Sequence, residues 1–171
     1  MASIAMERSM GVGVKAPALV SLILTGAIFG FFYAWVCSTM WGLDATDPRV
    51  AIQAMQAMNG SVRNAVFAPA FFGTGPVLLI TAFLAWKAGN SGAGSLFAVA
   101  GVIYIVAAMM LTMMVNVPMN EALALVDVPA DVDAAQATWT EYSGKWQVYN
   151  IARTVASGFS LMSVGIAFLR L

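Results

Sequence analysis

Long uncharged stretches dominate the pattern of this 171-residue chain. Positions 16–43, 64–86, 88–120 and 154–169 contain no Asp, Glu, Lys or Arg. The first three exceed the roughly 18–20 apolar residues that cross a bilayer, and the fourth reaches that length if Arg153 is paired or hydrated. The pattern predicts an all-α integral membrane protein, a four-helix bundle that forms one domain over residues 1–171 with spans at about 17–41, 64–86, 93–117 and 151–169.

Polar residues gather in the two long connections between these spans. In the first connection, Asp47 and Pro48 predict a helix start, and the residues after them form a helix near the membrane interface or extend the second span. In the second, residues 121–138 are acidic and predict an exposed loop, whereas residues 136–153 are amphipathic and lead into the fourth span as a helix. We expect residues 44–62 and 121–150 to form an extracytoplasmic cap over the bundle.

The charges bear on orientation. The eight basic residues divide equally between the two predicted sides, so counting Lys and Arg alone is indecisive. The eight acidic residues divide unequally, because the side with both termini and the 87–92 turn carries only Glu7. This imbalance and the shorter segments on that side favour a protein of the inner (cell) membrane with both termini in the cytoplasm.

Composition removes several classes of function. The chain is 61% apolar and 9% charged, against about 25% charged residues in a typical soluble domain. It has no histidine, one cysteine, and no dinucleotide-binding fingerprint, so we expect no haem, flavin or stoichiometric transition metal. No basic run predicts a nucleic-acid partner. The expected partners are membrane lipid, an apolar aromatic or quinone-type ligand, and a partner membrane protein or a second copy.

The strongest candidate site lies where the last helix enters the membrane. The steps of three, four, four and three residues place its members on one helix face: Trp139, Tyr142, Trp146, Asn150 and Arg153. An interfacial aromatic belt accounts for the first two. It accounts less well for Asn150 and Arg153, which are polar at membrane depth.

Two further polar groups fall at the same membrane side. Asn116 lies near the end of an apolar helix, where a lone amide needs a partner, and Asn120 shares its face if the helix continues past Pro118. Asn59 and Arg63 are four residues apart and face the same way. An up-and-down bundle brings these helix ends together, so we expect Arg63, Asn116, Asn150 and Arg153 to lie in one connected polar cluster.

These segments carry a family resemblance. Arg63-Asn64, Asn116-Val-Pro-Met-Asn120 and the pattern Trp139-x6-Trp146-x2-Tyr149-Asn150-x2-Arg153 resemble the anthrone oxygenase-like family of small four-span membrane proteins. Most members have no assigned activity. The family is named after fungal enzymes that oxidise anthrones to anthraquinones with O₂, without metal or flavin. The resemblance therefore implies a cofactor-independent monooxygenase.

The leading hypothesis assigns a role to each candidate. Arg63 and Arg153 stabilise an enolate, and Glu121, the one acid beside this set, is the candidate base. The predicted substrate-binding residues, some orienting the substrate oxygen and the indoles stacking on its rings, are Asn64, Asn116, Asn120, Trp139, Trp146, Tyr149 and Asn150.

Two alternatives stay open. A non-enzymatic accessory subunit that binds lipid or quinone would use the same Arg and Asn residues as structural contacts. Copper binding by the methionines of residues 109–114 is weaker, because methionine commonly fills gaps in apolar helices.

Overall fold

The computed structural model describes residues 2–171, with side chains from Gly13 onward. Within this part of the chain every regular element is a helix and there is no strand, as predicted. Four continuous helices are long and apolar enough to cross a membrane. Their elements, with η marking π-helical turns, are α1 (Ala2–Ala34), η1 (Trp35–Thr39) and α2 (Met40–Asp44); α4 (Phe67–Lys87); α5 (Ser91–Ile103), η2 (Tyr104–Met110), η3 (Thr112–Asn116) and α6 (Val117–Ala124); and α7 (Val132–Phe168).

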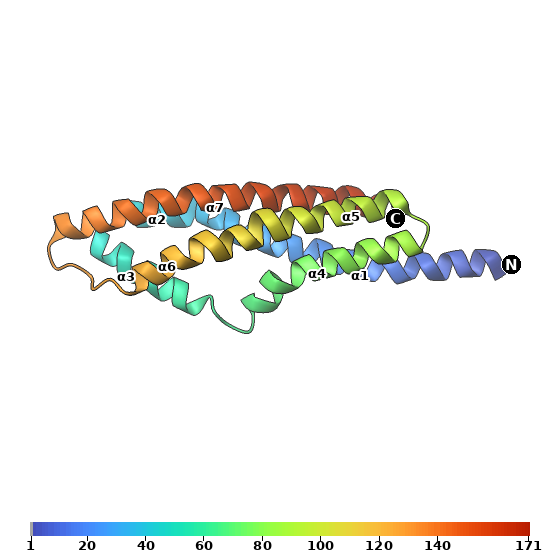
Figure 1. Ribbon diagram of the computed structural model, residues 1–171, viewed down its shortest axis with the longest axis horizontal. Coiled ribbons are helices and arrows are strands. Elements are labelled where there is room, and N and C mark those ends of the chain that lie inside the picture. Colours follow the sequence, from blue (N-terminus) through green and yellow to red (C-terminus); the bar gives the residue numbers. More distant parts are fainter. Residues whose placement is uncertain (1) are drawn as a thin grey trace.

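The helices form an elongated bundle whose two ends differ. The N-terminal end of α1 and the C-terminus lie at the same end, as four passes require (Figure 1). The opposite end contains α2, α3 (Pro48–Ser61), α6 and the start of α7. With 37 residues, α7 is about 56 Å long, against about 30 Å of hydrocarbon. A large part of α7 therefore stands outside the membrane and builds the predicted cap.

The cap is more helical than the sequence suggested. The sequence predicted a loop over residues 121–138. This prediction was wrong at both ends, because within this range only residues 125–131 lie outside helices. Pro118 does not end the third helix, since the π-helical turn η3 precedes it and Pro118 occupies the first turn of α6, where its missing N–H is tolerated. Leu123 then packs into the core of the cap.

Hydrogen bonds set the position of α3. The Asp47 side chain caps its N-terminus by accepting a hydrogen bond from the Arg49 backbone N–H at 2.9 Å. The Arg49 guanidinium also donates to this carboxylate, and these hydrogen bonds lower the pKa of Asp47 to about 2. Gln56 donates to the backbone carbonyls of Leu123 and Val126, both at 2.9 Å. The C-terminal half of α3 is thereby fixed against the last turn of α6 and the connection that follows it.

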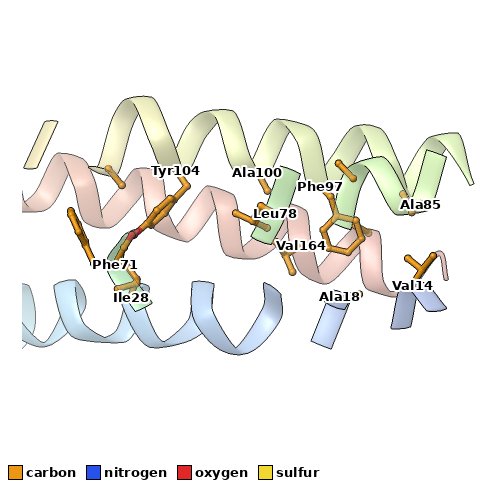
Figure 2. Close-up of a cluster of buried hydrophobic side chains, with 14 of the residues drawn as sticks. Val14, Ala18, Ile28, Phe71, Leu78, Ala85, Phe97, Ala100, Tyr104 and Val164 are labelled. Atoms are coloured by element: carbon orange, nitrogen blue, oxygen red, sulfur yellow. The ribbon is translucent and has the colours of Figure 1, made fainter. Parts of the chain in front are cut away.

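Small residues bring α4 close to the third helix. A Cβ atom at Gly75 would lie 2.6 Å from Cγ1 of Ile105, and one at Gly101 would lie 2.9 Å from Cδ2 of Leu79. Beside this crossing, the Tyr104 hydroxyl donates to the backbone carbonyl of Phe71 at 2.6 Å. Figure 2 shows this phenol pointing from the third helix toward α4. Helix α4 and the third helix are therefore closely packed where they face the bundle core.

Beyond that crossing α4 separates from the third helix. It contacts α1, α5 and η2, but neither η3 nor α6. The N-terminal third of α4 is consequently not packed against the segment that carries Asn116 and Asn120. This separation creates the space in which the candidate site lies.

The close approach at Gly75 predicts a position-specific effect on stability. Gly75→Ala forces Ile105 out of place, and overpacking of this kind typically costs about 1–3 kcal/mol of the free energy of unfolding. Gly73→Ala in the same helix is the matched control, because no atom lies within 4 Å of its Cβ position. Thermal unfolding in detergent should show a lower midpoint for Gly75→Ala alone; equal midpoints would contradict the packing described.

Candidate functional site

The space beside α4 is a cavity of about 1120 Å³. This volume is slightly above the roughly 300–1,000 Å³ of typical ligand sites. Its walls come from α1, η1, α3, α4, η3, α6 and α7, together with the residues between α3 and α4. Most of the lining is apolar, and the aromatic members are Phe31, Phe32, Trp35, Phe67, Phe71, Phe72 and Trp146.

The aromatic side chains form a continuous wall. Ring centroids lie 5.2 Å apart for Trp35 and Trp146, 4.8 Å apart for Phe31 and Phe67, and 5.5 Å apart for Phe67 and Phe71. These distances fall in the range in which aromatic rings attract each other. The wall offers flat apolar surface to a planar ligand.

Arg153 brings a positive charge to this apolar cavity. Its side chain is only 5% exposed, yet it lines the cavity. Its Nε and Nη2 donate to Oδ1 of Asn150 at 3.0 and 2.8 Å, and its Nη1 donates to Oγ1 of Thr112 at 3.2 Å. A guanidinium has five N–H groups. These three bonds leave two N–H groups without a protein acceptor among the side chains that the structure describes.

The charge of Arg153 is not balanced by an acid. In the described part of the chain, the ion pairs join other residues, and none involves Arg153. The guanidinium carbon instead lies 4.3 Å from the centroid of the Phe32 ring and 5.1 Å from that of Trp146. Cation–π contacts offset part of the unfavourable burial, by about 0.5–2 kcal/mol. A buried cation with free donors is suited to bind an anionic or carbonyl oxygen.

The neighbours of Arg153 hold it in place. Asn150 is 1% exposed and donates through Nδ2 to the backbone carbonyl of Phe32 at 3.3 Å, which connects α7 to α1. Thr112 donates to the backbone carbonyl of Ala108 at 2.7 Å, so its oxygen lone pairs face Arg153 as acceptors. Both residues therefore orient the guanidinium.

Asn116 is the least satisfied polar residue of the site. It is fully buried, and its Nδ2 lies 3.5 Å from the backbone carbonyl of Trp146. Its Oδ1 has no hydrogen-bond partner. Such a group is unfavourable unless another contact compensates for it. Asn116 is one helical turn from Thr112 but is not part of the cavity surface.

Asn120 organises a second polar network at the cavity rim. Its Oδ1 accepts hydrogen bonds from the Tyr142 hydroxyl at 2.8 Å and from Nε1 of Trp146 at 2.9 Å. The Tyr142 hydroxyl in turn lies 3.4 Å from Nδ2 of Asn59. The network joins α3, α6 and α7, and it fixes the indole of Trp146 in the cavity wall.

An exposed ion pair lies at the mouth of the cavity. Nη2 of Arg63 is 3.2 Å from Oε1 of Glu121, and both side chains are 58% exposed. Arg63 and Arg153 thus line the same cavity without joining one hydrogen-bonded network. Neighbouring Asn64 also lines the mouth, but its amide caps α4 by accepting from the backbone N–H groups of Val66 and Phe67.

Four predicted substrate-binding residues do not line the cavity, namely Asn116, Asn150, Trp139 and Tyr149. Trp139 lies in the core of the cap, where its Nε1 donates to Oδ1 of Asp44 at 2.9 Å. Tyr149 is 39% exposed and outside the cavity lining. Conversely, Phe32 and Thr112 were missed, since neither stands out in an apolar helix. In the described part of the chain, no three His, Cys, Asp or Glu side chains are grouped as metal ligands.

Comparison with known proteins gives one family. The model of the family described as anthrone oxygenase matches residues 63–163. This range contains every predicted site residue, from Arg63 to Arg153. Searches among curated proteins and among solved structures find no match.

The rim network predicts the effect of two changes at Asn120. Asn120→Ala leaves the buried Tyr142 hydroxyl and Trp146 N–H without their acceptor, at about 1–3 kcal/mol each. Asn120→Asp keeps an acceptor oxygen for both donors and is the matched control. Denaturant unfolding in micelles should rank the alanine variant well below the aspartate variant. Equal stability of the two would show that these hydrogen bonds contribute little.

Proposed function

This chain belongs to the anthrone oxygenase family, and we propose that its cavity binds a planar aromatic ketone or quinone-type compound and oxidises it with O₂. The observation that carries the proposal is the buried guanidinium of Arg153, which lines an aromatic cavity with two N–H groups free of protein acceptors. Membership of the family indicates the class of reaction. The position of Arg153 in the cavity offers a physical reason why this chain could carry out such a reaction.

The cavity has the features that such a substrate requires. Its aromatic wall matches flat rings, and stacking on Trp146 or Phe67 leaves the substrate edge free to face Arg153. A carbonyl oxygen at that edge accepts from the guanidinium. The hydrogen bond strengthens as the oxygen becomes an enolate, so the contact stabilises the charged state more than the neutral ketone. The low-dielectric surroundings increase this difference.

The proposed reaction converts a ring CH₂ group into a carbonyl. A base removes one proton, and the electron pair delocalises onto the substrate oxygen as an enolate. The enolate carbon transfers an electron to O₂ and then forms a C–O bond with it, and the resulting peroxide takes up a proton. Loss of the second C–H proton and cleavage of the O–O bond release water. Overall, CH₂ and O₂ give C=O and H₂O, with carbon oxidised and oxygen reduced.

Glu121 is the proposed base. Its carboxylate lines the cavity at the mouth, beside Arg63, where a proton taken from the substrate can pass to water. Arg63 positions this carboxylate. Arg153, at the buried end, has the separate task of holding the substrate oxygen.

The decisive test is removal of the Arg153 charge. Arg153→Met keeps an apolar side chain in the cavity wall but leaves Oδ1 of Asn150 without its two donors, so we expect the free energy of unfolding to fall by no more than about 1–3 kcal/mol. Affinity for anthraquinone and turnover of anthrone should each fall at least about tenfold, because a hydrogen bond to a charged group contributes about 1.5–3 kcal/mol. Lys145→Met, at an exposed position of α7, is the control.

Binding is measured by quenching of tryptophan fluorescence, and turnover by O₂ uptake above the rate with heat-denatured protein. A stable Arg153→Met protein that still binds and turns over normally would overturn the proposal. A variant that unfolds easily but retains its affinity when folded would favour the alternative, a membrane subunit in which Arg153 has a structural role.

The role of Glu121 predicts a different kinetic signature. Glu121→Gln keeps the shape of the side chain but removes its basicity, so turnover should fall at least about 100-fold, within the range typical of a general base. Affinity for anthraquinone should stay within about twofold, because the product has no proton to give. An unchanged turnover rate would exclude Glu121 as the base.

A further inference from the structure

The depth of Arg153 can be read from helix lengths. Arg153 lies 15 residues before Phe168, the last residue of α7, which corresponds to about 22 Å along the axis. Helix α4 has 21 residues, about 31 Å, which equals the thickness of the hydrocarbon core. Because α4 spans from Phe67 to Lys87, the level of Phe67 marks the outer edge of the hydrocarbon. Arg153 is therefore inside the membrane, below that edge.

The cavity is open to the side at this depth. Helix α4 makes no contact with η3 or α6, and each side of this gap carries an exposed residue that lines the cavity, Phe72 on α4 and Met113 on η3. Phe72 is 51% exposed and Met113 is 43% exposed. Met113 directly follows Thr112, which contacts Arg153, so this opening faces lipid rather than water.

A pair of charged side chains lies on the route into the cavity from water. Arg63 lies four residues before Phe67, above the outer edge, and its ion pair with Glu121 joins the α3–α4 connection to α6 across the mouth. A flat apolar ligand partitions into the bilayer, because leaving water is favourable by about 25 cal/mol for each Å² of apolar surface. A ligand of this class is thus concentrated where the lateral opening lies.

We propose that the ligand enters the cavity sideways from the bilayer, between the N-terminal third of α4 and η3, through a portal formed by Phe72 and Met113. The inference rests on the proposed function for the class of ligand, a planar aromatic ketone or quinone dissolved in the membrane. The Arg63–Glu121 ion pair lies on the aqueous side, where it presents charged groups instead of apolar surface to the ligand.

Blocking the portal with a bulky thiol label tests this route. Three single-cysteine proteins in a Cys37→Ser background carry Met113→Cys, Met114→Cys or Ser61→Cys, and each is compared before and after reaction with N-cyclohexylmaleimide. Met114 is the matched control, since it is the next residue, is 70% exposed and does not line the cavity. Ser61 lines the cavity on the aqueous side.

The probe is anthraquinone dissolved in the lipid of proteoliposomes, and its association rate is followed by quenching of tryptophan fluorescence. Labelling at Met113→Cys should slow association at least about tenfold, whereas labelling at Met114→Cys or Ser61→Cys should leave the rate within about twofold. An unchanged rate at Met113→Cys, or slowing at Ser61→Cys instead, would overturn lateral entry.

Failure of the portal and failure of the proposed function give different results. Association needs no turnover, so the portal is tested even if anthrone is never oxidised. If Arg153→Met binds anthraquinone normally while labelled Met113→Cys binds slowly, the portal stands and the role of Arg153 is wrong. If Arg153→Met loses binding while labelling at Met113→Cys has no effect, the function stands and entry is from water.

Discussion

A guanidinium buried among apolar and neutral side chains without a carboxylate partner is the constraint on which the rest of this site depends. Such a charge is strongly unfavourable unless it is hydrogen-bonded or pairs with a ligand. Here two neutral side chains and two aromatic rings compensate for it only in part. An acid beside Arg153 would neutralise its charge. The neutral partners Asn150 and Thr112 leave the charge and two N–H groups available for the oxygen of the proposed ligand.

The fold serves this arrangement by two means. Three π-helical turns interrupt the first and third helices, and turns of this kind often occur at functional sites because they redirect side chains. One of them carries Thr112 and Asn116 toward α7. The tight crossing at Gly75 and Tyr104 then lets α4 diverge beyond it, so that the space beside Arg153 remains open instead of being filled by packing.

The bundle itself was predictable from the sequence, because charge-free stretches of this length have few alternatives in a membrane. Which residues of α7 share one helix face was also predictable. Which part of the protein each of them contacts was not. Trp139 and Arg153 share a face, yet they are 14 residues apart, about 21 Å, so one reaches the cap core and the other the cavity. Helical periodicity predicts which face of a helix a side chain occupies, but not which part of the protein lies opposite that face at a given depth.

Other features depend on pairings that sequence patterns do not contain. Nothing in the sequence indicates that Asp44 accepts from Trp139, or that Thr112 accepts from Arg153. The helical continuation past Pro118 depends on the π turn before it. Asn64 resembled a ligand-binding amide, but it occupies a turn that requires its side chain as a helix cap.

The most direct measurement of the central claim is the infrared C=O stretch of anthraquinone bound to the purified protein. If a carbonyl oxygen accepts from the Arg153 guanidinium, one of the two stretches should shift to lower frequency in the wild-type protein. That shift should be lost in whatever ligand Arg153→Met retains at saturating concentration. Two unshifted stretches in the wild-type complex, matching those of anthraquinone in hydrocarbon solvent, would contradict the claim that this buried charge holds the ligand.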